Sequence, residues 1–247
     1  MLHGGPGSAH DALEALSALI DQGRRVVFYD QLGSGESDRP DDPSLWTVET
    51  FIEQLRSVRE GLGLDEIHLF GSSWGGMLAV EYALREPEGL ASLVLNSTPS
   101  SAPRWAEETA RLAAGLDGEE FRRRHICRLD PEPDVLQRAR AKFGKQVYET
   151  MWGPNEFTVT GTLKDWDVIG RLGEIRVPTL ITSGRYDECT PTLVQPLHRG
   201  IAGSEWVLFE HSAHMPYLEE PERYLRVVGE FLERVEARPE PGLEGSG

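Results

Sequence analysis

The chain has 247 residues, of which 39% are hydrophobic, and a chain of this size can bury the core of one α/β domain. Its 41 acidic residues outnumber 25 lysines and arginines, and the formal net charge of −16 argues against nucleic acid or an anionic membrane as a partner. The two cysteines, Cys127 and Cys189, are isolated and lack a metal-ligand spacing, so the sequence indicates neither a disulfide framework nor a metal site. No apolar run is long enough to span a membrane and no signal segment follows Met1, so we expect a cytoplasmic protein.

A glycine-rich loop, His3-Gly4-Gly5-Pro6-Gly7, opens the chain. Such a loop can present backbone N–H groups to a reacting carbonyl, and Gly5 is the candidate donor. Apolar periodicity then predicts a helix at about residues 9–22, a strand over 25–29 and a second helix at about 48–62. Asp30 and Gln31 follow the strand, and we expect them to brace the glycine loop by hydrogen bonds rather than to take part in chemistry.

The most specific motif is Gly71-Ser72-Ser73-Trp74-Gly75, which follows the apolar run 67–70 and precedes the helix-forming run 76–84. A G-x-S-x-G sequence between a strand and a helix is typical of a nucleophile elbow. Its glycines let the strand and helix backbones approach closely, and the turn exposes the central hydroxyl at the helix N-terminus. Ser73 is therefore the candidate nucleophile, and the N–H of Trp74 is the second candidate donor to an oxyanion.

Strands and helices alternate up to about residue 98, which predicts a parallel sheet with helices on both faces. Residues 90–95 form a near-continuous apolar run, as a strand covered on both faces requires. From about residue 100 to 173 the sequence is helical and charged and contains no further predicted strand, which indicates an insertion. Within it, the run Arg122-Arg123-Arg124 is interpreted as a solvated helix face rather than a phosphate site.

A buried strand is predicted over residues 178–183, and Asp187 lies beyond its carboxyl end, where the catalytic loops of open α/β sheets lie. Asp187 is therefore the candidate orienting acid. Asp165 and Asp167 are weaker candidates, because they precede the strand that should deliver the acid.

The last predicted strand, 206–209, leads to a loop that contains His211 and His214 and then to a closing helix at about residues 219–235. A serine nucleophile needs a general base, and one of these histidines should supply it. Periodicity does not separate the two, because both lie in the same loop.

Together these motifs resemble the proline iminopeptidase family of α/β-hydrolases. The resemblance runs from the first residue to about Leu232 and rests on the HGGPG loop, Asp30-Gln31-Leu32-Gly33-Ser34-Gly35-Glu36-Ser37-Asp38, the GSSWGG elbow, Arg185-Tyr186-Asp187-Glu188 and the loop His211–His214. It implies an α/β-hydrolase fold, with a mostly parallel sheet, helices on both faces and an inserted helical cap. The core would comprise residues 1–98 and 176–235, the cap residues 99–175 and a disordered tail residues 236–247.

The start of the chain departs from the family pattern. Only Met1 and Leu2 precede the glycine loop, whereas two or more strands normally come before it in this fold. By comparison with the family, the first β-hairpin and most of the strand that feeds the loop are missing. We expect either a start codon set too late or a shortened sheet with an uncovered edge.

The resemblance also implies roles for individual residues. In this family the histidine in the position of His214 is the base. A family segment that places a carboxylate over the active site matches Glu156 and its neighbours, and Glu188 matches a second such carboxylate. Two carboxylates near the nucleophile would bind the protonated amine of a peptide's first residue. An apolar pocket suited to a prolyl side chain would be formed by Trp74, Trp152 and Phe157.

We therefore predict a serine aminopeptidase that releases an N-terminal residue, preferably proline, from short peptides through an acyl-enzyme. The substrate would be a small peptide or an amino-acid amide or ester, and no metal or cofactor is implied. The first alternative is an esterase or amino-acid amidase with the same triad, and the second is an inactive or binding-only protein on this scaffold. Dehalogenase and epoxide-hydrolase chemistry are disfavoured, because both need a carboxylate at the position of Ser73. The sequence does not indicate the oligomeric state.

Overall fold

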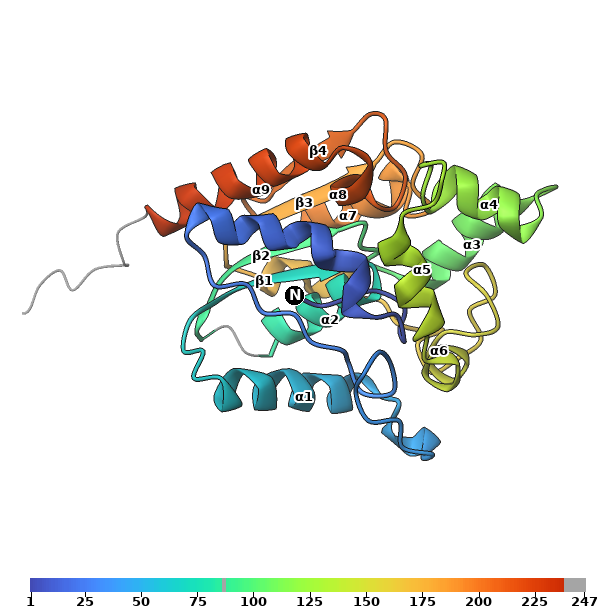
Figure 1. The fold of residues 1–247 in the computed structure, drawn as a ribbon, viewed down its shortest axis with the longest axis horizontal. Coiled ribbons are helices and arrows are strands. Elements are labelled where there is room, and N and C mark those ends of the chain that lie inside the picture. Colours follow the sequence, from blue (N-terminus) through green and yellow to red (C-terminus); the bar gives the residue numbers. More distant parts are fainter. Residues whose placement is uncertain (86–87, 238–247) are drawn as a thin grey trace, which may run out of the picture.

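The structure, a computed structural model, describes residues 1–85 and 88–237 (Figure 1). Its centre is a parallel sheet of four strands in the order β1-β2-β3-β4. The strands are β1 (Ile67–Ser72), β2 (Leu90–Asn96), β3 (Thr179–Gly184) and β4 (Glu205–Phe209). The four strands match predicted apolar runs in position, and the predicted fold class, a parallel α/β sheet of the hydrolase type, is confirmed.

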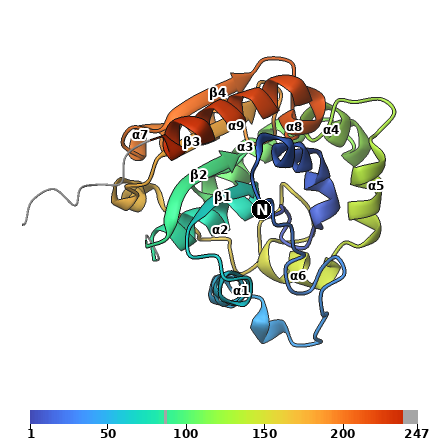
Figure 2. The same cartoon turned by 60° about the vertical axis from the view of Figure 1, so that its left-hand side comes forward.

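Helices cover both faces of this sheet (Figures 1 and 2). The helices on one face are α1 (Val48–Gly61), α2 (Trp74–Ala83) and α7 (Pro191–Gly200), and those on the other are the 3₁₀ helix η1 (His10–Gln22), α8 (Pro216–Glu219) and α9 (Pro221–Glu236). Successive residues of a strand point to opposite faces, so each strand contributes to two separate cores. Leu69 and Leu93 belong to the core beneath α1 and α2, whereas Phe70 and Val94 belong to the core beneath η1 and α9.

A helical insertion separates β2 from β3; its helices α3 to α6 lie to one side of the sheet, whereas its last turn, η3, packs against α7 (Figure 1). Its helices are α3 (Ala102–Ala113), α4 (Gly118–His125), α5 (Asp134–Ala141), α6 (Lys145–Met151) and the 3₁₀ helix η3 (Ile169–Glu174), and a further short 3₁₀ turn, η2 (Pro43–Leu45), precedes α1. Helix α5 packs against η1, so the insertion rests on the part of the core that follows the glycine loop (Figure 2).

The helix predicted at about residues 9–22 is present, but it is a 3₁₀ helix rather than an α-helix. Leu13, Leu16 and Leu19 are its buried leucines, and they recur every third residue. A 3₁₀ helix has three residues per turn, so this spacing places all three leucines on one face. In a helix with 3.6 residues per turn the same spacing would step round the axis by about 60° each time and cover an arc of about 120°.

The predicted strand over residues 25–29 is wrong, because this segment joins no ladder within the described residues. A strand is defined by repeated pairing with a neighbour, and here the contact is a single bond from the Met1 amino group to Val27 O at 2.9 Å. Leu2, the next residue, pairs instead with β1. Its N–H donates to Phe70 O at 2.8 Å, and Leu2 forms a parallel bridge with Gly71.

The closing helix ends at Glu236, one residue beyond its predicted end. Of the tail predicted at 236–247, residues 238–247 lie outside the described residues. Within the part of the chain that the structure describes, no helix is both long and apolar enough to cross a membrane.

Close backbone approach defines the turn between β1 and α2. A Cβ on Gly71 would collide with the carbonyl oxygen of Gly75, and one on Gly75 would collide with Leu2 O. A Cβ on Gly76 would strike the hydroxyl of Thr98, which follows β2. The glycines of the motif therefore let the strand, the helix and the first residues of the chain meet at one point.

We expect Gly76→Ala to destabilise the protein by about 1–3 kcal/mol, because the new methyl group must displace packed atoms. The control is Gly61→Ala at the end of α1, where a Cβ meets nothing within 4 Å. The control should raise stability by up to about 1 kcal/mol, since alanine restricts the unfolded chain. Urea denaturation followed by circular dichroism measures both, and equal effects of the two substitutions would contradict the close approach.

Candidate active site

One cavity of about 760 Å³ brings together most of the residues singled out from the sequence. The predicted site residues in its wall are Gly5, Ser73, Glu156, Glu188 and His214. Asp187 lies directly behind His214, bonded to its ring. Trp74, Trp152 and Phe157 are not among the residues that line the cavity.

Ser73 occupies the turn between β1 and α2 with φ of 56° and ψ of −121°. A non-glycine residue in such a conformation stores strain, and it persists only because the surrounding structure holds it. Ser73 is the N-cap of α2, and Trp74 is the first helical residue, so its N–H has no partner within the helix. The glycine loop lies against the serine: a Cβ on Gly4 would be 3.9 Å from Ser73 Oγ.

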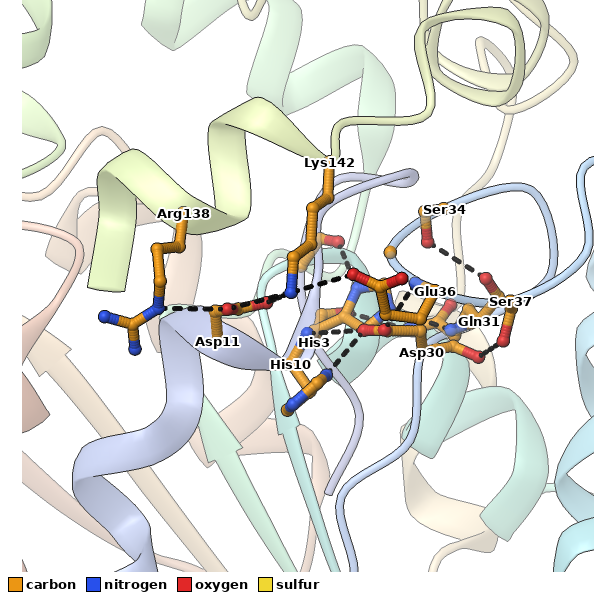
Figure 3. Close-up of polar contacts among 12 residues, drawn as sticks. His3, His10, Asp11, Asp30, Gln31, Ser34, Glu36, Ser37, Arg138 and Lys142 are labelled. Carbon is orange, nitrogen blue, oxygen red and sulfur yellow. Dashed lines mark hydrogen bonds and ion pairs between the residues drawn. The ribbon is translucent and has the colours of Figure 1, made fainter. Parts of the chain in front are cut away.

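Gln31 braces the glycine loop, as predicted (Figure 3). Its backbone N–H donates to His3 Nε2 and its side-chain amide donates to His3 O, both at 2.9 Å. Burial lowers the pKa of His3 to about 4, so the ring is neutral and its Nε2 can accept this bond. The Gln31 side-chain oxygen accepts a bond from Trp74 Nε1 at 2.8 Å, which joins the loop to the elbow.

The prediction for Asp30 is wrong, because its bonds among the described residues go to His10, the first residue of η1, and to its own loop, and not to the glycine loop. The Asp30 carboxylate accepts bonds from the backbone N–H groups of His10 and Glu36, each at 2.8 Å, and one from His10 Nδ1 at 2.9 Å (Figure 3). A Cβ on Gly35 would collide with this carboxylate. The glycines of the 30–38 loop therefore serve a packed turn next to the glycine loop.

Asp11 ties the helical insertion to this region (Figure 3). Its carboxylate is buried and accepts bonds from Arg138 Nε at 3.3 Å and Lys142 Nζ at 3.2 Å. Lys142 also pairs with Glu36 at 3.1 Å. Burial alone would raise the pKa of Asp11, but the bonds from Lys142 and Arg138 outweigh it and lower that pKa.

His214 and Asp187 form a short, buried pair. His214 Nδ1–H donates to Asp187 Oδ1 at 2.6 Å, and the side chains are 5% and 0% exposed. Asp187 Oδ1 also accepts a bond from the backbone N–H of Cys189 at 2.8 Å. Burial disfavours the charged ring, but the charge of Asp187 and its hydrogen bond outweigh burial and raise the pKa of His214. The pair therefore fixes one tautomer, with Nε2 free to face the cavity.

Within the described residues no hydrogen bond joins Ser73 to His214, although both line the cavity. The nearest carboxylate to the free ring nitrogen is Glu188, whose Oε1 lies 3.8 Å from His214 Nε2. Catalytic hydrogen bonds are often long without substrate and tighten in the complex, so the arrangement is compatible with proton transfer between the two. His211 is exposed, is not part of the cavity wall and contributes its backbone N–H to Glu220 at 3.2 Å.

The segment 125–128, which begins at the last residue of α4, links the loop that carries Asp187 to the loop that carries His214. His125 O accepts the N–H of Glu188, and Ile126 O accepts the N–H of His214, both at 3.1 Å. Glu219 completes the junction: its two carboxylate oxygens accept the N–H groups of Arg128 and Ala213, each at 2.8 Å. A piece of the insertion thus fixes the backbone of both loops.

Two carboxylates form the deep, acidic part of the cavity. Glu188 is 2% exposed, and its Oε2 has no hydrogen-bond partner among the described residues. Burial raises the pKa of Glu188 well above its usual range, and the neighbouring charges of Glu156 and Asp187 raise it further. The carboxyl group of Glu156 is also enclosed, although part of the residue reaches solvent, and burial raises its pKa despite the nearby Tyr148 hydroxyl and His214. Buried carboxylates without a cation are expected to bind one.

The aromatic residues predicted for the pocket stand behind its wall. Trp152 packs edge-on against Trp105, with ring centroids 5.6 Å apart, and Trp105 packs in the same way on the ring of His214 at 6.3 Å. Phe157 packs against Phe121 of α4. The ring of Trp74 packs on Phe51 in the core and is not part of the cavity wall.

Three residues important to this geometry were missed in the sequence. Trp105 covers His214 and donates its ring N–H to Glu156 O at 2.8 Å, Tyr148 brings a buried hydroxyl toward Glu156, and Glu219 joins the loops. No pattern marks them, because each is an ordinary helix residue until the insertion is placed over the sheet. Within the described residues, no cluster of three or more histidines, cysteines and acidic residues could hold a metal ion.

Comparison with known proteins adds independent findings. Residues 1–221 match the family model described as the alpha/beta hydrolase fold. The chain is 41% identical to the proline iminopeptidase of Clostridium botulinum, over 95% of this chain and 89% of that protein.

Two solved structures agree. The proline iminopeptidase of Mycobacterium smegmatis superposes with a TM-score of 0.90 at 37% identity, covering 95% of this chain and 88% of that one. The structure of VinJ superposes with the same TM-score at 39% identity, covering 95% of this chain and 89% of that one.

The raised pKa of Glu188 predicts how stability depends on pH. The carboxyl group of Glu188 holds its proton more tightly in the folded chain than in the unfolded chain, where its pKa has the usual value of 4.5. As the pH rises above 4.5, the unfolded chain loses this proton first, so the free energy of unfolding falls toward neutral pH. Glu188→Gln removes that dependence. We expect the variant to be more stable than the wild type at pH 7 by about 1–2 kcal/mol, the order of the penalty for an unsatisfied buried polar group, and the difference to shrink toward pH 4.5.

Urea denaturation of both proteins at a series of pH values measures this difference. Glu149→Gln, at an exposed position of α6, is the matched control and should change neither curve. A Glu188→Gln variant that is less stable than the wild type at pH 7 would mean that the carboxylate is well satisfied in the free protein.

Proposed function

The chain belongs to the proline iminopeptidase family of α/β-hydrolases, and on that premise we propose that it is a serine aminopeptidase that releases the first residue, preferably proline, from short peptides. One observation carries the proposal: a single cavity contains a serine at a nucleophile elbow, a histidine bonded to a buried aspartate, and two enclosed carboxylates. The first three groups suit acyl transfer, and the carboxylates suit a substrate with a free amine.

In the acylation step, Ser73 Oγ attacks the carbonyl carbon of the first residue while His214 Nε2 takes the hydroxyl proton. Asp187 keeps the ring in the tautomer that leaves Nε2 free and stabilises the positive charge that develops on it. The carbonyl oxygen becomes negative and accepts bonds from the N–H groups of Gly5 and Trp74. His214 then gives its proton to the leaving amine as the C–N bond breaks, which leaves the first residue esterified to Ser73.

Water completes the cycle. His214 takes a proton from a water molecule, the hydroxide attacks the ester carbonyl, and the same two N–H groups stabilise the oxyanion. Ser73 regains its proton from His214 as the C–O bond breaks, and the free amino acid leaves. The peptide and this one water molecule are the reactants of the two steps.

The carboxylates Glu156 and Glu188 limit the reaction to the first peptide bond. The α-amino group of a peptide is largely protonated near neutral pH, and two buried carboxylates would hold that ammonium group by charge-assisted hydrogen bonds. If the ammonium is held there, the carbonyl of the first residue is the one that reaches Ser73. The orphan Oε2 of Glu188 supports this role, since an incoming N–H donor would satisfy it.

The subsite for the prolyl ring is assigned to the aromatic layer near His214. Trp105 does not line the cavity, but it packs on the ring of His214, which does, and it is backed by Trp152, so we propose that Trp152 shapes the subsite indirectly, through Trp105 and His214. We assign Phe157 a similar supporting role, through Phe121. Rigid aromatic surfaces of this kind suit a compact apolar ring.

We further propose that residues 99–175 act as a cap on a core formed by 1–98 and 176–235. Support comes from the helices that this insertion adds to one side of the sheet and from the cavity wall, to which both parts contribute. The cytoplasm is the proposed location, supported by two buried cysteines that form no disulfide.

We expect the protein to release arylamine from a prolyl arylamide, and to leave the N-acetylated arylamide essentially uncleaved, because acetylation removes the ammonium group that the carboxylates would bind. The initial rate of arylamine release measures both, with Ser73→Ala as the blank. Equal cleavage of both substrates would remove the amine site and indicate an esterase or amidase. Cleavage of neither by folded protein would sink the proposal.

Glu156→Gln should lower kcat/KM for the prolyl arylamide by about 10–100-fold, since it weakens a charge-assisted contact with the ammonium. The loss should be largest at low substrate concentration. Glu149→Gln, at an exposed position of α6, is the control and should behave as the wild type. A Glu156→Gln variant with unchanged kinetics would leave Glu188 as the sole amine ligand.

A further inference from the structure

The exposed part of the cavity wall is basic, although the protein as a whole is strongly acidic. Five arginines contribute to it, together with three carboxylates. The arginines are Arg122, Arg123, Arg124, Arg128 and Arg140, and the carboxylates are Glu119, Asp130 and Glu132. The enclosed wall instead contains two acidic residues, Glu156 and Glu188. The cavity is therefore electrostatically polar, with an acidic inner part and a basic mouth.

Four of the five arginines already have carboxylate partners. Arg122 lies 3.3 Å from Glu119, Arg124 lies 2.6 Å from Glu120, and Arg123 lies 4.0 Å from the same Glu120. The fourth, Arg140, pairs with Glu132. These pairs neutralise most of the mouth, as expected of the solvated helix face predicted from the sequence.

Arg128 differs from the other four. Within the described residues its guanidinium forms no ion pair with a carboxylate, and its contact is with an aromatic ring. Its guanidinium lies over the ring of Tyr186, 3.9 Å from the ring centre, and Tyr186 is 43% exposed. A guanidinium that contacts an aromatic ring through its face keeps its N–H groups in its own plane, where they remain available to a carboxylate.

The backbone beneath Arg128 is fixed to the catalytic loops. Its N–H donates to Glu219 at 2.8 Å, and Ile126, two residues earlier, accepts the N–H of His214. Two residues of chain span at most about 7 Å, so the Cα atom of Arg128 lies within that distance of the Cα atom of Ile126, whose carbonyl group contacts the histidine loop. Tyr186, on which the guanidinium rests, immediately precedes Asp187. The backbone of Arg128 is therefore tied to the loop that carries His214, and its guanidinium rests on the loop that carries Asp187.

We propose that Arg128 binds the C-terminal carboxylate of a short peptide substrate and is therefore a specificity-determining residue. The inference rests on the proposed function: with the peptide's ammonium at Glu156 and Glu188, the chain beyond the cleaved bond runs outward past His214 toward the mouth. A di- or tripeptide has its second charge one or two residues beyond that bond. The polarity of the cavity then matches the polarity of the zwitterionic peptide.

The test compares Pro-Gly-Gly with its C-terminal amide, measuring proline release by chromatography. The wild type should favour the free acid in kcat/KM by about fivefold, as one exposed but oriented ion pair provides. Arg128→Gln should bring this ratio close to one, and Arg128→Lys should give an intermediate ratio, because lysine keeps the charge but lacks the planar fork. Arg123→Gln changes the net charge of the mouth equally and should keep the wild-type ratio.

The readout is a ratio of two substrates on one enzyme, so a partial loss of folding or of overall activity cancels. The ratio should also fall toward one in 0.5 M salt, since screening weakens an exposed pair. Equal cleavage of acid and amide by the wild type would overturn the proposal, as would an Arg128→Gln variant that keeps the preference. A failure of the proposed function is separate, because it would appear as no cleavage of the prolyl arylamide, which has no carboxylate.

Discussion

The strained turn at Ser73 is the constraint on which the rest of the site depends. Strand β1 and helix α2 meet so closely that Gly71 and Gly75 have no room for a side chain. The backbone of Leu2 packs against Gly75 at the same turn. The contact between strand and helix holds Ser73 at a positive φ, with its hydroxyl next to Gly4 and at the start of a helix. Burial of apolar side chains in two cores, one on each face of the sheet, offsets the cost of this strained backbone.

Hydrogen bonds among buried polar groups connect this turn to the other parts of the site. Gln31 links the glycine loop to the elbow, and the segment 125–128 links the loops that carry Asp187 and His214. None of these bonds takes part in bond making or breaking. Their effect is to fix the glycine loop, Asp187 and His214 before any substrate binds, and preorganisation of this kind is a main source of rate enhancement in acyl transfer.

The ionisable groups of the cavity are arranged in a way that does not favour the stability of the free protein. Glu188 and Glu156 are enclosed without a cation, an arrangement that lowers the stability of the free protein. A protein retains such groups where a ligand supplies the missing charge, and in the proposed function the ammonium group of a peptide does so. The stacked, unpaired Arg128 at the mouth is the counterpart at the other end of the cavity.

Most of the fold could be predicted from the sequence, because apolar runs and turn residues report directly on local structure. The elbow at Ser73 is a further example, since its glycines have a steric purpose that local sequence reveals. The failures have physical reasons too. Residues 25–29 have the composition of a strand, yet a strand also needs a partner, and pairing is not a local property.

Contacts across the insertion were the least predictable part of the site. Trp105 reaches His214, and Glu219 joins Arg128 to Ala213, only because α3 and α4 fold back over the carboxyl ends of the strands. Residues far apart in the chain show no periodic relation, so their sequence neighbourhood carries no signal of the contact. The resemblance to a family identified Glu156, whereas composition and spacing did not distinguish it from a surface carboxylate.

The central claim is that Ser73 is a nucleophile activated by the buried His214–Asp187 pair. Reaction with a fluorophosphonate, followed by intact mass and peptide mapping of the folded protein, tests it most directly. The account predicts one adduct per chain, located on Ser73 and absent from Ser73→Ala. No adduct on demonstrably folded wild-type protein, or an adduct at another residue, would contradict it.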